Sequence, residues 1–133
     1  MILVDTSVWI ALLGVGTETR VAQRDLLRFV TCGPIAQEIL QGLRDDGARG
    51  EAFRDAFSSI PKLSDPLPWT TFLEAAAIYR TGRRKGYTIR SSTDCLIAAI
   101  AIENRVPVWH RDRDFELIAR YTALETLETL QPR

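Results

Sequence analysis

The N-terminal stretch Ile2-Leu3-Val4-Asp5-Thr6-Ser7-Val8-Trp9 joins three local patterns. Residues 2–4 are apolar and rich in β-branched side chains, which favours a short buried strand. A carboxylate, Asp5, follows directly, and Thr6 and Ser7 are hydroxyl residues suited to cap a helix that we expect to end near Leu13. The stretch therefore predicts a strand, an acid at the strand's carboxyl end, and then a helix.

Strands and helices are expected to alternate along the rest of the chain. Apolar runs bounded by turn residues predict further strands at residues 29–32, 60–63, 107–109 and 123–126. Apolar residues at helical spacing predict further helices around residues 21–27, 33–43, 48–59, 69–81, 94–103 and 115–120. This alternation is typical of an α/β protein, a three-layer α/β/α domain with a mainly parallel central sheet. No linker or repeat divides residues 1–133, so we expect a single domain.

Two of these helices are expected to contribute most to the core. The helix at 69–81 presents Phe72, Leu73, Ala76 and Ala77 at helical spacing, and we expect it to end before Gly82. The helix at 94–103 is apolar all round, which is typical of a helix buried in the centre of a domain.

Composition and cysteine content exclude several classes of protein. With 46% hydrophobic and 26% charged residues among 133, the chain is not expected to be disordered. Its longest apolar run, residues 95–102, is well short of the ~20 residues that a membrane span needs, and the N-terminus lacks a secretory signal pattern. We therefore expect a cytoplasmic protein that does not enter the membrane. Cys32 and Cys95 form no C-x-x-C pair and are expected to be reduced, buried thiols.

Acidic residues gather where ligands bind in parallel α/β sheets, beyond the carboxyl ends of the strands. Asp5 follows the first strand, Asp112 and Asp114 follow the strand at 107–109, Asp94 begins the apolar helix, and Glu38 lies one turn into the helix at 33–43. Carboxylates that face one pocket repel one another unless they are protonated or bind a metal ion. Oxygen ligands favour Mg²⁺ or Mn²⁺.

Most of these acids also have a purely structural interpretation. Asp94 is a favourable residue for the first turn of a helix, and Asp114 is a suitable N-cap for the helix at 115–120. Glu38 alone is typical of a solvated helix face. Asp5 has no adjacent Lys or Arg, so a buried carboxylate there needs hydrogen-bond donors or a cation from elsewhere.

Three segments together resemble the PIN-domain ribonucleases, specifically the VapC-type toxins: Val4-Asp-Thr-Ser-Val-Trp-Ile10, Asp94-Cys-Leu-Ile-Ala-Ala-Ile-Ala101 and Trp109-His-Arg-Asp-Arg-Asp-Phe115. The resemblance implies a Mg²⁺- or Mn²⁺-dependent endoribonuclease that hydrolyses RNA phosphodiester bonds. It also implies the toxin of a type II toxin–antitoxin pair, inhibited by a VapB-type antitoxin and forming a homodimer.

The family's acidic quartet maps onto four residues of this chain: Asp5, Glu38, Asp94 and Asp112. Asp114 is an alternative for the fourth acid, and Thr6 matches the hydroxyl that follows the first acid. The resulting hypothesis has Asp5 and Asp94 as the main ligands of one Mg²⁺, with Glu38 and Asp112 completing the site.

The cations are unevenly distributed, although 17 Lys and Arg balance 17 Asp and Glu. Residues 80–93 contain no acid and carry a cluster of cations: Arg80, Arg83, Arg84, Lys85 and Arg90. Because acids that bind a metal repel RNA, this segment is the best candidate to hold the strand, with Arg83, Arg84, Lys85 and Arg90 as its contacts. The structural alternative is a solvated helix end whose cations complement the helix dipole.

Other functions remain open on sequence grounds. Receiver-like phosphoacceptor domains also place acids around Mg²⁺, but they have paired acids after the first strand, where this chain has only Asp5. A non-catalytic metal- or peptide-binding module is a further alternative, and DNA is an alternative substrate. A Ser-His-Asp mechanism is disfavoured because the only histidine, His110, lies in a loop rich in Arg and Asp, where a structural role or a minor RNA contact is expected.

Overall fold

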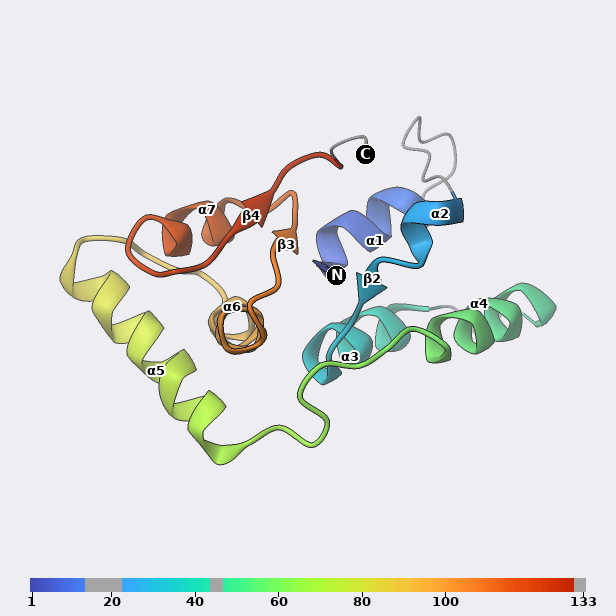
Figure 1. Cartoon of the computed structure of the whole chain (residues 1–133), viewed down its shortest axis with the longest axis horizontal. Helices are drawn as coiled ribbons and strands as arrows, with labels where there is room; N and C mark the ends of the chain where they lie inside the picture. The colour runs from blue at the N-terminus through green and yellow to red at the C-terminus, as the bar shows by residue number, and fades with distance from the viewer. Residues whose placement is uncertain (14–22, 44–46, 131–133) are drawn as a thin grey trace.

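The computed structural model describes residues 1–13, 23–43 and 47–130, which form a four-stranded parallel sheet (Figure 1). The strand order is β2-β1-β3-β4, and the strands are β1 (Ile2–Val4), β2 (Phe29–Val30), β3 (Val108–Trp109) and β4 (Thr126–Leu127). Leu3 pairs with Val30 on one side and with Val108 on the other. All three residues of β1 are buried, as a central strand covered on both faces requires. The expected parallel sheet is confirmed.

Helices cover both faces of the sheet. In the described residues they are α1 (Thr6–Leu13), α2 (Gln23–Leu26), α3 (Gly33–Gly42), α4 (Ala48–Ser58), α5 (Trp69–Arg84), α6 (Ser92–Asn104) and α7 (Arg113–Ala119). Figure 1 shows α1 on one side of the sheet and α6 on the other. Right-handed crossovers require this arrangement, because the chain moves from β1 to β2 in one direction and from β2 back past β1 to β3 in the other. The three-layer α/β/α fold is therefore confirmed.

The helix that is apolar all round lies in the core, as expected. In α6 the residues Cys95, Ala98 and Ile100 are buried, and together with β1 and α7 they form one continuous hydrophobic cluster. Burial raises the pKa of Cys95 to about 11 and that of Cys32 to about 12, so both thiols stay protonated at neutral pH.

The expected core face of α5 was wrong. Its buried residues are Thr71, Ala75, Ile78 and Gly82, whereas Phe72 and Leu73 are exposed. Small side chains on the buried face let α5 pack closely along α6, and Thr71 satisfies its hydroxyl by donating to Glu103 at 2.7 Å. The apolar pattern predicted the neighbouring face, with Phe72 and Leu73, because hydrophobicity does not indicate how closely two helices can approach each other.

The expected end of α5 at Gly82 was also wrong, since the helix continues to Arg84. Gly82 lies inside the helix because a Cβ there would overlap the Tyr121 hydroxyl, which donates a hydrogen bond to the carbonyl of Ile78. Here glycine permits a close approach and does not end the helix.

Two further expectations differ from the structure. The strand at 60–63 is reduced to one isolated bridge between Thr31 and Lys62. The apolar side chains of Leu26 and Leu27, expected on the apolar face of one helix, are exposed, and Val21 lies outside the described residues. No helix in the described ranges is long and apolar enough to cross a membrane.

Candidate metal centre

The carboxyl ends of β1 and β3 lie side by side and bring two of the candidate acids together. The backbone N–H of Asp5 donates to the carbonyl of Trp109 at 2.9 Å, which places the residue after β1 beside the end of β3. Asp112 follows three residues after Trp109, at the start of α7. This is the edge at which parallel α/β sheets bind ligands.

Asp5 caps α1 with its own side chain, which corrects the expectation that Thr6 or Ser7 would do so. Its Oδ2 accepts hydrogen bonds from the backbone N–H of Ser7 at 3.1 Å and from the Ser7 hydroxyl at 2.6 Å. The Ser7 Oγ also accepts from the backbone N–H of Arg111 at 3.0 Å. Ser7 therefore connects the carboxylate of Asp5 to the loop after β3.

Glu38 reaches the same edge of the sheet from α3. Pro34 lies in the first turn of this helix, where the lack of an N–H costs nothing, and Glu38 follows one turn later. The hydroxyl of Thr6 donates to Glu38 Oε1 at 3.3 Å, so the residue after Asp5 positions the second acid.

Asp94 is held at the start of α6. Ser91 caps this helix by accepting a hydrogen bond from the backbone N–H of Asp94 at 3.3 Å. The Asp94 side chain is 6% exposed, and its Oδ2 is buried without any hydrogen-bond partner. Burying a carboxylate oxygen without a partner is costly, so this atom needs a proton or a cation.

Asp112, and not Asp114 as expected, is the N-cap of α7. Asp112 is the N-cap and accepts from the backbone N–H of Asp114 at 2.9 Å, whereas Asp114 is buried inside the first turn. The Oδ2 of Asp114 accepts from the backbone N–H groups of Arg90 and Ser91 at 2.9 and 3.1 Å. Asp114 therefore ties the connection between α5 and α6 to α7.

The acids converge closely enough to perturb one another. One carboxylate oxygen from each of Asp94, Asp112 and Asp114 lies within 4.8 Å of the others. Burial, followed by the charges of Asp112, Asp5 and Asp114, raises the pKa of Asp94 to about 8. Burial and neighbouring carboxylates also raise the pKa values of Asp5 and Glu38.

These residues fit a divalent cation. In the described part of the chain, Asp94 has no ion-pair partner, and nothing nearby lowers its pKa. Several carboxylates around one orphaned, buried oxygen are the ligands that Mg²⁺ and Mn²⁺ prefer. The acidic cluster can therefore hold a metal ion.

His110 supports the loop between β3 and α7 and is not free for acid–base catalysis. It is 2% exposed, its Nδ1 accepts from the backbone N–H of Asp112 at 3.1 Å, and its Nε2 contacts Glu116 Oε1 at 3.0 Å. Because Nδ1 is an acceptor, the ring proton lies on Nε2 and points to Glu116. Both ring nitrogens are engaged, which supports the structural role expected for this residue.

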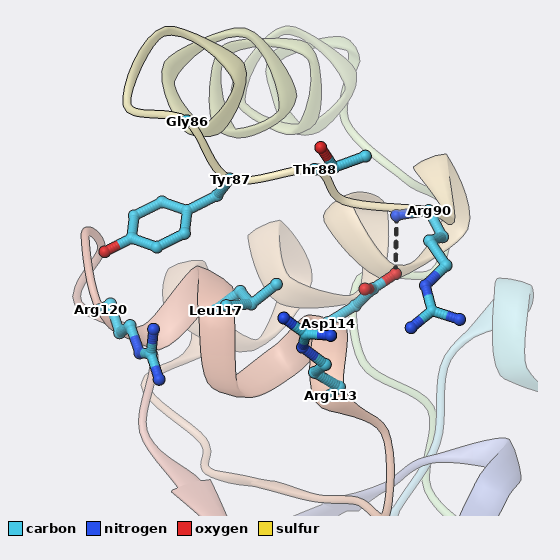
Figure 2. Close-up of a pocket in the computed structure, with 8 residues that line it drawn as sticks. All are labelled: Gly86, Tyr87, Thr88, Arg90, Arg113, Asp114, Leu117 and Arg120. Atoms are coloured by element: carbon cyan, nitrogen blue, oxygen red, sulfur yellow. Dashed lines mark hydrogen bonds between the residues drawn. The ribbon is translucent and has the colours of Figure 1, made fainter.

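The expected RNA contacts divide into two groups. Arg83, Arg84 and Lys85 are exposed at the C-terminal end of α5. Arg90 lies at a pocket together with Arg113 and Arg120 of the α7 region (Figure 2). Arg113 and Arg120 could not be predicted from the sequence, because they line the same pocket as Arg90 only through the packing of α7 against the connection between α5 and α6.

A Ser7→Ala substitution is expected to lower the free energy of unfolding by ~1–2 kcal/mol, because two hydrogen bonds, one partly buried and one exposed, lose their shared hydroxyl. Ser58→Ala is a matched control, since the Ser58 hydroxyl bonds its own helix on an exposed surface. We expect the control to change stability by no more than ~0.5 kcal/mol. Urea unfolding measures both, and equal effects would show that Ser7 does not link Asp5 to the loop.

Comparison with known protein families identifies the fold and the family. The PIN domain family matches residues 2–121 of this chain. The chain belongs to the PIN-domain family. Within it, the chain is 43% identical to the VapC ribonuclease Mb1587 of Mycobacterium bovis and to the ribonuclease VapC11 of Mycobacterium tuberculosis, over 94% of this chain and 96% of each relative. This PIN domain is therefore a member of the VapC ribonucleases, as the sequence resemblance predicted.

Solved structures share the fold of this PIN domain. FitAcB from Neisseria gonorrhoeae aligns with a TM-score of 0.71 at 22% identity, covering 96% of this chain and 97% of the other. The VapBC-5 toxin–antitoxin structure from Mycobacterium tuberculosis aligns with a TM-score of 0.68 at 19% identity, with the same coverage.

Proposed function

We propose that this PIN-domain protein is a Mg²⁺- or Mn²⁺-dependent endoribonuclease that hydrolyses RNA phosphodiester bonds. The observation that carries this proposal is the buried, unpartnered Oδ2 of Asp94 among the carboxylates of Asp112 and Asp114. Relatives at 43% identity are named ribonucleases, which supports RNA over DNA as the substrate.

Asp5 and Asp94 would be the main metal ligands, with Glu38 and Asp112 completing the set. When bound, the metal would activate water and neutralise negative charge that develops on the phosphate. The protein positions its acids for this purpose: Ser7 fixes the Asp5 carboxylate and Thr6 fixes Glu38.

Asp114 is assigned a positioning role in this proposal. One of its oxygens is occupied by two backbone N–H groups that lie just before α6. It therefore fixes the position of the helix start that carries Asp94, and its negative charge adds to the demand for a cation.

We further propose that the protein is the toxin of a type II toxin–antitoxin pair, forms a homodimer and is inhibited by a VapB-type antitoxin. Related folds were solved as VapBC toxin–antitoxin proteins. Ile10 and Leu27 are 66% and 89% exposed, and an apolar pocket of ≈ 460 Å³ lies between α1, α2 and α4. Exposed apolar surface of this kind is typical of a protein–protein contact.

The test is cleavage of a pool of folded cellular RNAs by the purified protein with Mg²⁺ or Mn²⁺, and with EDTA as the metal-free control. We expect cleavage only with metal, and recovery when excess metal follows EDTA. Cleavage that persists in EDTA would contradict metal dependence. Metal binding without cleavage of any RNA would favour a non-catalytic binding module.

A further inference from the structure

A pocket of ≈ 430 Å³ opens between α7 and the connection from α5 to α6, next to the acidic cluster. Its lining includes three arginines, an aromatic ring and one acid: Arg90, Arg113, Arg120, Tyr87 and Asp114. Figure 2 shows Arg90 and Arg113 beside Asp114 at one end, with Tyr87 and Arg120 at the other. We call this feature the basic pocket.

Among the described residues, the positive charges of the basic pocket have no balancing ion pairs. Arg90, Arg113 and Arg120 are exposed, and none has a carboxylate within ion-pair distance in the described ranges. The one lining acid, Asp114, directs an oxygen at backbone N–H groups of the pocket wall. A concave surface with three guanidinium groups and one carboxylate favours an anion, and arginine is well suited to phosphate.

The ring of Tyr87 contacts Arg120 and is not a free surface on which a base could stack. Tyr87 stacks on Tyr121 with ring centroids 5.6 Å apart and planes at 9°. The guanidinium carbon of Arg120 lies 5.9 Å from the centroid of the Tyr87 ring. Because the Tyr87 ring already contacts Tyr121 and Arg120, the groups that the pocket presents to a ligand are mainly its cations.

The position of the pocket identifies the anion. Asp114 belongs both to the basic pocket and to the acidic cluster, and Arg90 directly precedes Ser91, the residue that caps the helix of Asp94. An RNA strand carries a phosphate at every nucleotide, so a strand with one phosphate at the acids presents the next within this neighbourhood.

We propose that the basic pocket binds a backbone phosphate of the RNA adjacent to the one that is cleaved, with Arg113 and Arg120 as its principal contacts. This inference rests on the proposed ribonuclease function and adds a substrate-positioning site to it. The strand then passes along α7, and the exposed cations Arg83, Arg84 and Lys85 at the end of α5 are not its main contacts.

The test compares three double variants with the wild type. Arg113→Gln with Arg120→Gln removes both charges, Arg113→Lys with Arg120→Lys retains them, and Arg83→Gln with Arg84→Gln is the matched control at the end of α5. Binding of a short fluorescent oligouridylate is measured by anisotropy in EDTA over a series of salt concentrations. Circular dichroism confirms that each variant is folded.

We expect the glutamine variant of the pocket to weaken binding by ~10-fold. We also expect it to reduce the slope of log affinity against log salt by ~0.7, the value for one phosphate contact with a single strand. The lysine variant should keep the wild-type slope, and the α5 control should lose less affinity and less slope than the glutamine variant of the pocket.

An unchanged slope in the glutamine variant, a loss confined to the α5 control, or no binding by the wild type would each overturn the basic pocket as a phosphate site. RNA cleavage with Mn²⁺, assayed in parallel, separates this inference from the proposed function. A wild type that cleaves RNA while the pocket variant binds normally would contradict only the pocket. A wild type that binds through the pocket but cleaves no RNA would contradict only the proposed activity.

Discussion

Replacing Asp94 with Asn is expected to reduce RNA cleavage by ~10³-fold or more, since a metal ion contributes several kcal/mol to stabilising the transition state. The substitution keeps the size of the side chain but removes the charge of the most perturbed acid in the cluster. The substitution is expected to preserve the start of α6, because the backbone N–H of Asp94, not its side chain, makes the capping bond to Ser91. The measurement is the rate at which a defined RNA is cut in saturating Mn²⁺.

Three further variants make this result specific. Asp5→Asn should cause a loss of similar size, and Glu38→Gln a smaller one, because Glu38 is only partly buried at the edge of the cluster. Asp55→Asn, at an exposed site on α4, is the matched control and should leave the rate unchanged. Wild-type cleavage by both Asp94→Asn and Asp5→Asn would place the reaction elsewhere or attribute it to a contaminating nuclease.

The same Asp94→Asn variant is expected to be more stable than the wild type when no metal is present. Burial and three neighbouring acids raise the pKa of Asp94 from 3.8 to about 8, so its charged form is disfavoured in the folded protein. At a pH below the pKa of this carboxyl group in the unfolded chain, the group is protonated in both states and does not lower stability. Stability then falls as the pH rises from about 4 to about 8, because only the folded protein disfavours the charged form. Asparagine carries no charge at any pH in this range, so the variant avoids this loss of stability.

The expected gain for Asp94→Asn is on the order of 5 kcal/mol at pH 8, because the pKa rises from 3.8 to about 8 and ~1.4 kcal/mol corresponds to one pKa unit. The two proteins should become similar in stability near pH 4. Urea unfolding in EDTA across this range measures the difference, and Asp55→Asn serves again as the control. A wild type that is more stable than Asp94→Asn at pH 8 without metal would mean that protein groups already compensate the charge of Asp94.

The gathering of the candidate acids at one edge of the sheet followed from the sequence because it depends on chain connectivity. Asp5 directly follows a buried strand and Asp94 begins the most apolar helix, and in a parallel sheet both positions lie at the same edge. The first turn of α3 was also predicted, because Pro34 fixes where that helix begins.

Features that depend on packing were not predicted. The buried face of α5 is set by the close approach of Gly82 to Tyr121, which no local pattern shows. The N-cap of α7 was predicted at Asp114 and lies at Asp112, because the sequence leaves the first residue of a helix uncertain by one or two positions. The basic pocket was not predicted because it too depends on packing: Arg90 and Arg120 line one pocket only because α7 packs beside the connection between α5 and α6.

Binding of a divalent cation by the carboxylates around Asp94 is tested most simply by direct titration with Mn²⁺. Electron paramagnetic resonance of free Mn²⁺, measured as metal-free protein is added, reports binding without any substrate. We expect the wild type to deplete the free Mn²⁺ signal saturably, Asp94→Asn to lose at least ~10-fold in affinity, and Asp55→Asn to match the wild type. Equal Mn²⁺ binding by the wild type and Asp94→Asn, or no binding by either, would show that the acidic cluster is not a metal site.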